Sequence, residues 1–132
     1  MENYLLSSAI NAVASQRLVR KLCDCKTPDK MTDLEYNLAR KYMDIDRDKE
    51  IYRPNGCPKC NDGYKGREAC EEVFILTDEF RDMVRNNQID LVSVSNFAKE
   101  NNFIPMVANG LQKVFNGTTS FEELINVMYD QI

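Results

Sequence analysis

Two close pairs of cysteines constrain the fold of this chain more than any other feature of its sequence. Cys23 and Cys25 form the first pair, and Cys57 and Cys60 form the second. Thiolates at such spacings can meet at one tetrahedral zinc ion, and a metal shared by two distant segments holds those segments together. The sequence therefore predicts a structural zinc site whose ligands are Cys23, Cys25, Cys57 and Cys60.

The two pairs differ in how closely they follow this pattern. Gly56 precedes the second pair and Gly63 follows it, which lets the backbone turn sharply around a metal, as in a zinc knuckle. The first pair encloses only Asp24, a tighter spacing than the usual two residues. The segment between Cys25 and Cys57 is longer than the roughly 15–20 residues of a compact zinc ribbon, so we expect it to carry a helix.

Other roles for the cysteines stay open at this point. They could be reduced thiols that are buried as small apolar groups. A disulfide framework is disfavoured because no secretory signal peptide is recognised and the total of five cysteines is odd. A thiol redox module is disfavoured because the pairs lie far apart and no βαβ pattern surrounds them. The fifth cysteine, Cys70, lies in an apolar run, and we expect it to pack in the core.

Composition narrows the class of function. The formal net charge is −4 and the basic residues are scattered, which disfavours nucleic-acid binding. The chain has no histidine, the usual general base near neutral pH, and no Gly-rich phosphate loop, so we expect no catalysis by this chain alone. No apolar run approaches the roughly 20 residues that span a bilayer, and we expect a soluble chain.

Apolar periodicity predicts a helix over residues 4–22, where apolar side chains recur at three- and four-residue intervals. A helix this apolar needs a partner surface, so we expect it to belong to a larger domain. Arg17 and Arg20 lie near its end, where cations compensate the helix dipole.

Local signals predict the elements that follow. Thr32 and Glu35 have the spacing of a capping box, which predicts a short helix within the insert. Residues 51–53 and 72–76 are extended candidates that could pair across the metal. Thr77 can cap a helix that runs to about residue 86.

The C-terminal part of the sequence predicts three short helices, at about residues 91–100, 105–116 and 121–129. Pro105 suits a first turn, Gly117 suits a C-terminal cap, and Ser120 with Glu123 has the spacing of a second capping box. We expect one compact body whose shared apolar layer contains Phe97, Met106, Leu111, Val114, Phe115, Phe121, Leu124, Ile125 and Met128.

Three blocks of sequence carry a resemblance to a known family. The first is residues 5–10 with the Gln-Arg-Leu-Val-Arg string at 16–20, the second is the cysteine- and glycine-rich stretch 56–67, and the third is residues 110–114 with 117–124. In this order they resemble the C-terminal region of the ATPases that drive type II secretion and type IV pilus assembly. The second block resembles that family's zinc-knuckle signature.

The resemblance implies a mainly α fold with a small β and zinc-knuckle element, an α-helical fragment of the C-terminal lobe of a RecA-like secretion ATPase. Residues 1–22 would be the closing helix of the motor core. Residues 23–76 would form a tetracysteine zinc-binding subdomain with a helical insert, and residues 77–132 a C-terminal helical segment.

The resemblance also implies a function, that of a non-catalytic part of a cytoplasmic, hexameric ATPase at the inner face of the cell membrane. Zn²⁺ would be its structural cofactor, whereas ATP and Mg²⁺ would bind only in the full-length parent, whose phosphate-binding loop, acidic boxes and histidine box would lie upstream of Met1. Its partners would be neighbouring ATPase subunits and inner-membrane platform proteins, with no nucleic acid. Arg17 and Arg20 could lie near a nucleotide or a subunit boundary of that assembly.

The chain departs from the family pattern at two places. The family has two residues between its first two cysteines, whereas only Asp24 intervenes here. After Arg67 the family continues with threonine, glycine and an apolar pair, whereas residues 68–72 are Glu-Ala-Cys-Glu-Glu, which predicts a more acidic exit strand.

A function of another class stays open beside the resemblance. The chain could be a free-standing zinc-ribbon module whose knuckle loop touches a protein or a nucleic acid. The residues that would make this contact are Lys59, Tyr64, Lys65 and Arg67.

Overall fold

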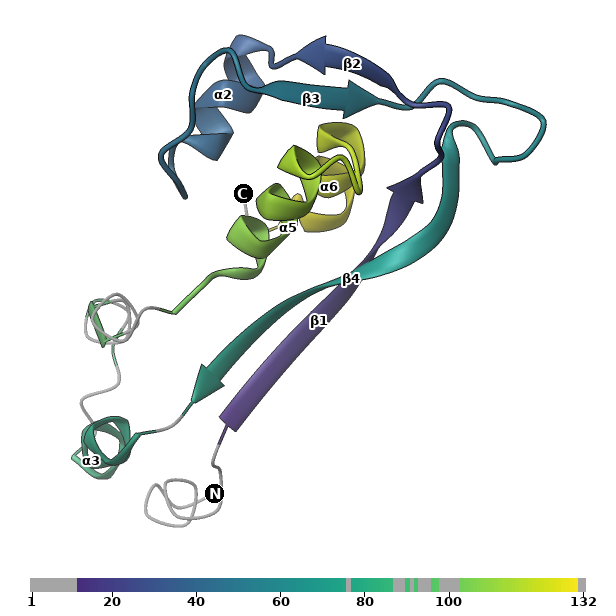
Figure 1. Ribbon diagram of the computed structural model, residues 1–132. Helices are drawn as coiled ribbons and strands as arrows, with labels where there is room; N and C mark the ends of the chain where they lie inside the picture. The colour runs from purple at the N-terminus through teal and green to yellow at the C-terminus, as the bar shows by residue number, and fades with distance from the viewer. Residues whose placement is uncertain are drawn as a thin grey trace. The chain divides into compact units, whose positions relative to one another are not determined.

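The computed structural model describes residues 12–75, 77–86, 90, 92, 96–97 and 103–130 (Figure 1). In these residues the chain is a small α/β protein with four helices and two two-stranded sheets. Strands and helices take up similar lengths of the described chain, so the expected mainly α fold is not confirmed.

The chain divides into two compact units rather than the single body expected from the sequence. The larger unit consists of Gln16–Glu71 with Pro105–Ile132, and the smaller consists of Met1–Ser15 with Glu72–Ile104. None of the helices in the described part of the chain is long and apolar enough to cross a membrane.

The prediction of a helix over residues 4–22 is wrong for its second half, because Ala12–Leu22 form strand β1; residues 4–11 lie outside the described residues. β1 pairs with the long strand β4 (Tyr64–Ile75). Within this strand Val19 is fully buried, whereas its neighbour Leu18 is 51% exposed. Hydrogen bonds to β4 thus outweigh the helical spacing of the apolar residues.

The second sheet joins the two ends of the insert. β2 (Thr27–Lys30) pairs antiparallel with β3 (Glu50–Arg53), with Thr27 opposite Arg53 and Lys30 opposite Glu50. The extended conformation of residues 51–53 is confirmed, but their predicted pairing with residues 72–76 is wrong. β3 pairs with β2, and the second segment continues β4 as far as Ile75.

The insert carries the predicted helix, α2 (Asp33–Ala39), with the predicted cap. Thr32 Oγ1 accepts a hydrogen bond from the Glu35 N–H at 3.2 Å, and the Thr32 N–H donates to Glu35 Oε1 at 2.9 Å. Both halves of the capping box are therefore present, which explains why the helix begins at Asp33.

In the smaller unit, Thr77 caps α3 (Asp78–Arg85) as predicted. Phe74 packs against Phe80, Phe97 and Phe103 with ring centroids 4.9–5.6 Å apart. Phe97 therefore belongs to this aromatic cluster, and its predicted place in the C-terminal apolar layer is wrong. Most of the helix predicted over residues 91–100 lies outside the described residues.

The last two predicted helices are confirmed as α5 (Met106–Phe115) and α6 (Phe121–Met128), whose N-caps are Pro105 and Ser120. After α5, Gly117 has a φ of 79°, the Gly117 N–H donates to Val114 O at 3.1 Å, and the Thr118 N–H donates to Lys113 O at 2.9 Å. These two bonds make a Schellman motif, the C-terminal cap expected from Gly117.

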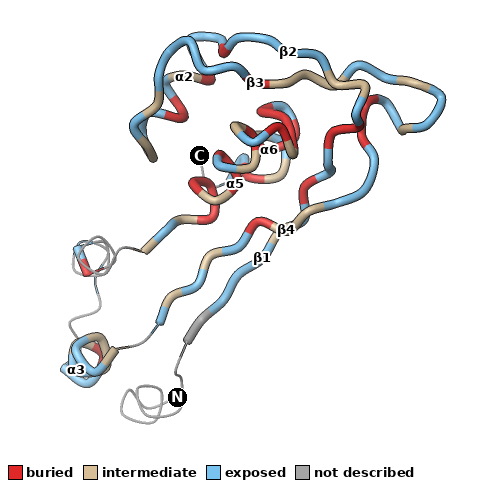
Figure 2. The backbone as a smooth tube through the Cα atoms, viewed as in Figure 1, coloured by how far each residue is buried: buried red, intermediate tan, exposed pale blue. Residues whose placement is uncertain are grey.

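The core of the larger unit lies between these helices and the strands (Figure 2). Cys70 is fully buried in it, as expected. Gly110 of α5 lets α6 approach closely, because a Cβ at this position would lie 2.4 Å from Leu124 Cδ1. The buried members of the core are Val19, Met31, Leu38, Ala39, Ile51, Cys70, Met106, Val107, Leu111, Val114, Phe121, Leu124 and Met128.

Candidate metal centre

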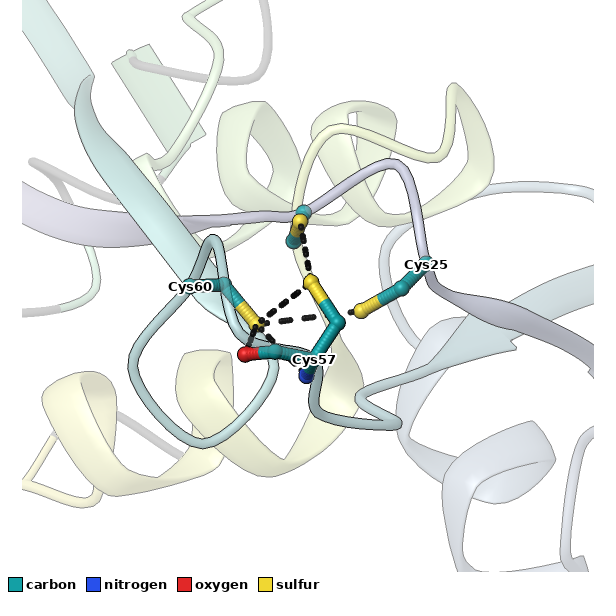
Figure 3. A group of neighbouring side chains, drawn as sticks. Cys25, Cys57 and Cys60 are labelled. Atoms are coloured by element: carbon teal, nitrogen blue, oxygen red, sulfur yellow. Dashed lines mark hydrogen bonds between the residues drawn. The ribbon is translucent and has the colours of Figure 1, made fainter.

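The larger unit brings together all four cysteines that the sequence singled out. The Sγ atoms of Cys23, Cys25, Cys57 and Cys60 all lie within 4.8 Å of one another, and Figure 3 shows three of these side chains pointing toward a common point. The Sγ–Sγ distances are 3.5 Å for Cys57–Cys60, 3.7 Å for Cys23–Cys57 and 3.8 Å for Cys25–Cys60. A tetrahedron with Zn–S bonds of about 2.3 Å has edges of about 3.8 Å, so these three edges are close to those of a zinc site, and the four cysteines could hold a metal ion.

The second pair is shaped by its own loop. The Cys60 N–H donates to Cys57 O at 3.3 Å, and the Cys57 N–H donates to Cys60 Sγ at 3.2 Å. Gly63 closes the loop with a φ of 98°, and a Cβ there would lie 2.4 Å from the Cβ of Pro54. Only glycine fits this position, which accounts for the knuckle signature in the sequence.

The first pair lies at the junction of β1 and β2. The Lys26 N–H donates to Cys23 O at 3.0 Å, so residues 23–26 form a tight turn, and the Cys23 N–H donates to Gly63 O at 2.9 Å beside the second pair. This turn brings both sulfurs into the cluster although only Asp24 separates them. The short spacing is therefore compatible with a four-sulfur site.

Hydrogen bonds within the cluster favour one thiolate over the others. Burial disfavours the Cys60 thiolate, but hydrogen bonds from the Cys57 thiol and the Cys57 N–H lower the pKa of Cys60 to about 7. The Lys59 N–H favours a Cys57 thiolate, but the hydrogen bond to Cys60 raises the pKa of Cys57 to about 12. Cys60 would therefore offer a thiolate to a metal ion near neutral pH, and the other three cysteines would lose their protons on binding it.

Basic side chains border the cluster. Lys21, Lys59 and Lys65 line a groove together with Cys23, Asp24, Cys25 and Cys57. Zn²⁺ with four thiolates carries two net negative charges, which nearby ammonium groups offset. With such an ion bound, Lys59 and Lys65 would have a local electrostatic role beside the cluster, apart from any contact with a partner.

Tyr64 does not belong to an exposed contact surface. It is 8% exposed, its hydroxyl lies 2.6 Å from Ser120 Oγ, and the Arg20 guanidinium lies 4.2 Å from its ring centroid. Burial also raises the pKa of the Tyr64 hydroxyl. The sequence makes Tyr64 a candidate contact residue of the knuckle loop, but its hydroxyl instead joins this loop to the N-cap of α6.

Arg17 and Arg20 do not lie at the end of a helix of their own, as expected, because they lie on β1. Arg17 instead donates to Val127 O at 2.8 Å, in the last turn of α6. Arg17 donates to both carboxylate oxygens of Asp130 at 2.6 and 2.8 Å. Arg20 donates to Glu123 through its backbone N–H at 2.7 Å and through its guanidinium at 3.0–3.1 Å. Both side chains therefore fasten the strand to the C-terminal helix and its end.

The pairing of Arg20 also alters the predicted cap of α6. Ser120 Oγ accepts from the Glu123 N–H at 3.1 Å, so the forward half of the capping box is confirmed. Among the described contacts of the Glu123 carboxylate are those to Arg20, which the spacing of the box did not predict. The Glu123 carboxylate therefore pairs with Arg20, a residue distant in sequence, in addition to any role at the cap.

Sequence reasoning missed a second ionic centre, around Arg53. Its guanidinium donates to Glu35 at 2.6 and 2.7 Å and to Asp29 at 2.9 Å, and it also donates to Glu122. Burial raises the pKa of Glu35, but the hydrogen bonds from Arg53 outweigh it and leave this pKa lowered. Nothing in the local sequence around Arg53 indicates these partners, which lie 18 to 69 residues away.

The sequence was compared with known proteins. It matches the family model described as "Type II/IV secretion system protein" over residues 1–126. Type II secretion system protein E of Aeromonas hydrophila is 35% identical over 130 residues, which are 96% of this chain and 25% of that protein. Type II secretion system ATPase E of Vibrio cholerae is 35% identical over 132 residues, which are 96% of this chain and 25% of that protein.

A relative from a pilus system shows the same coverage. The type IV pilus assembly ATPase PilB of Acinetobacter baylyi is 30% identical over 131 residues, which are 95% of this chain and 22% of that protein. The chain thus spans about a quarter of the length of the curated relatives that it matches.

Proposed function

The chain belongs to the type II/IV secretion system protein family, and from this membership we propose that it is a zinc-binding, non-catalytic C-terminal part of an ATPase that powers type II secretion or type IV pilus assembly. The observation that carries the proposal is the four-sulfur cluster, three of whose Sγ–Sγ distances are close to the edge of a zinc tetrahedron, in a chain that matches such ATPases over nearly its full length.

The proposed role of the metal is structural. Zn²⁺ bound by Cys23, Cys25, Cys57 and Cys60 would join the β1–β2 junction to the β3–β4 loop. A structural zinc ion contributes its binding free energy to folding. The apparent binding free energy is about 10–16 kcal/mol in isolated zinc-finger peptides at pH 7, and the contribution to folding is smaller where the metal-free chain is already folded. The metal would thereby give the motor a rigid appendage that moves as one piece.

The sequence supports the non-catalytic part of the proposal. It has no histidine and no Gly-rich phosphate loop, and Arg17 and Arg20 are already paired with carboxylates of this chain. ATP and Mg²⁺ would bind elsewhere in the parent protein. In the assembled machine this part would contact neighbouring subunits of a hexamer and inner-membrane platform proteins from the cytoplasmic side.

We also propose a division of labour along the chain. Residues 1–22 would belong to the motor core, with a strand at Ala12–Leu22 in place of the helix first expected. Residues 23–76 would be the zinc-binding subdomain and residues 77–132 the C-terminal segment. Limited proteolysis of the zinc-loaded chain, which should cut near residues 76–77 and spare the zinc-binding part, tests the second boundary.

The proposal of a zinc site is tested by elemental analysis of the chain purified without chelator. We expect about one zinc per chain, because one four-thiolate site holds one ion. The Cys25→Ser variant tests the short first pair and should lose most of the metal, with Cys70→Ser as the control that retains it. Folded wild-type protein with less than half an equivalent of zinc would contradict the proposal.

A further inference from the structure

The turn between α5 and α6 contacts the chain on both sides of the first cysteine pair. Before the pair, the Leu22 N–H donates to Thr118 O at 2.8 Å. After the pair, Lys26 Nζ donates to Gly117 O at 2.8 Å. Consecutive carbonyl groups of one turn thus hold the residues that flank Cys23 and Cys25.

The same turn also contacts Arg20 of β1, which precedes Leu22. Thr119 is fully buried, and its hydroxyl donates to Arg20 O at 2.8 Å. An unpaired hydroxyl in a buried position costs free energy, so this bond commits Thr119 to β1. Together with the Leu22–Thr118 bond, it fixes the register of the end of the strand against the turn.

The turn has a shape that admits little change. Gly117 has a φ of 79°, and a Cβ there would lie 3.0 Å from Lys26 Nζ and 3.1 Å from the ring of Tyr52. The Lys26 ammonium also lies 4.8 Å from the ring centroid of Tyr52, so the ring and the Gly117 carbonyl hold it from two sides. The Schellman motif that closes α5 therefore presents a preformed surface to the cysteine turn.

The two cysteine pairs differ in how they are supported. The second pair is shaped by bonds within its own loop, Cys60 N–H to Cys57 O and Cys57 N–H to Cys60 Sγ. Among the described hydrogen bonds, the turn of the first pair has one of its own, from the Lys26 N–H to Cys23 O, whereas Cys23 and the flanking Leu22 and Lys26 bond to distant residues. The conformation of the second pair is thus held by bonds within its own loop, whereas that of the first pair depends mainly on tertiary contacts.

We propose that the α5–α6 turn positions Cys23 and Cys25 for the metal, with Lys26 and Thr119 as positioning residues. The inference rests on the proposed zinc site. Coupling between two sites is reciprocal, so the factor by which the docked turn strengthens metal binding equals the factor by which the metal stabilises the docked turn. The metal ion and the start of α6 then form one cooperative element.

Zinc affinity of the whole chain tests the positioning role. The Lys26→Met and Thr119→Val variants each lose one hydrogen bond to or from the turn, and we expect each to weaken zinc binding about five- to tenfold. Affinity is measured by competition with a chromophoric chelator. The controls Lys30→Met and Thr27→Val, in the exposed strand β2, should keep wild-type affinity. Lys26→Arg, which keeps a cationic donor, should recover most of the lost affinity.

Hydrogen exchange of the wild-type chain tests the reciprocal effect without any substitution. Removing zinc with a chelator should speed exchange of the Leu22 amide, which donates to the turn, by at least about tenfold. The Arg40 amide, bonded to Tyr36 O in the insert, should change far less.

The outcomes separate the two proposals. A wild-type chain that binds no zinc contradicts the metal site itself. Folded Lys26→Met and Thr119→Val variants that bind zinc as tightly as the controls contradict only the positioning role. An unchanged exchange rate at Leu22 also overturns it, because the metal would then not stabilise the docked turn. An equal increase at Leu22 and Arg40 overturns it as well, because the metal would then stabilise the whole unit and not the turn in particular.

Discussion

Replacing Arg53 with methionine should destabilise the larger unit strongly, because it leaves a buried carboxylate without its cation. The Arg53 side chain is 20% exposed and that of Glu35 only 8%. Their two hydrogen bonds of 2.6 and 2.7 Å form a bidentate ion pair, the strongest geometry for these groups. Methionine keeps an unbranched apolar stem but lacks the guanidinium, so the loss is mainly that of the charge and its hydrogen bonds.

The magnitude follows from the burial of the pair. Removing one partner of a fully buried ion pair costs roughly 3–5 kcal/mol. Because Arg53 is partly exposed and water can reach it, we expect about 2–3 kcal/mol for Arg53→Met near neutral pH. Asp29 and Glu122 are about half exposed and add little to this figure.

The effect should depend on pH, with a sign set by Glu35. Arg53 holds the pKa of Glu35 below its ordinary value of about 4.3, although burial opposes this. A lowered folded-state pKa contributes stability that is present above the unfolded pKa and is lost as pH falls through the folded pKa. The difference between wild type and Arg53→Met should therefore be full at pH 7 and shrink at acid pH below about 4.

Urea unfolding at a series of pH values measures this difference. Loss of the proposed zinc at acid pH would affect both chains and would cancel in the comparison. The matched control is Arg47→Met, since Arg47 also binds a carboxylate at 2.6 Å, but the two side chains are 43% and 93% exposed. We expect about 1 kcal/mol or less for the control. Equal losses for the two variants, or a difference that does not change with pH, would refute the reasoning.

Two further predictions concern the metal centre. Cys60→Ser should abolish stoichiometric zinc binding and lower the melting temperature. Cys70→Ser should keep the metal and cost about 1–3 kcal/mol of stability, because it places a polar group in the core. Calorimetry with zinc analysis checks both variants, and equal effects would contradict the distinction between ligand and core. Gly63→Ala should destabilise more than Gly66→Ala in urea unfolding, because both glycines have positive φ but only at Gly63 would a Cβ lie 2.4 Å from Pro54 Cβ; a larger loss at Gly66 would show that the close approach is unimportant.

The clustering of the four cysteines could be predicted from the sequence because cysteine spacing limits where thiols can share one ion. The glycines that turn the knuckle are also visible in the sequence, and the short first pair proved compatible with the cluster. The contacts that hold this first pair were not predictable. Lys26 and Thr119 resemble ordinary surface residues in the sequence, and their hydrogen bonds to Gly117 O and Arg20 O form only when the α5–α6 turn lies beside the end of β1.

The strand at Ala12–Leu22 shows where reasoning from periodicity fails. Its apolar residues have helical spacing, and Val19 and Leu22 are both buried, as a helix would also require. The hydrogen bonds that make it a strand come from β4, far along the chain. A pattern within one segment contains no information about such a partner.

By itself, the sequence determined those features that depend on neighbouring residues: the caps at Thr32, Thr77 and Ser120, the Gly117 terminus of α5, and the candidate ligands. These depend on bonds that span three or four residues, and local residue types specify such bonds. Tertiary structure alone decided the strand conformation of β1 and the ionic partners of Arg17, Arg20 and Arg53. Arg17 and Arg20 meet carboxylates 113 and 103 residues away, and only folding brings charges so far apart in sequence within bonding distance.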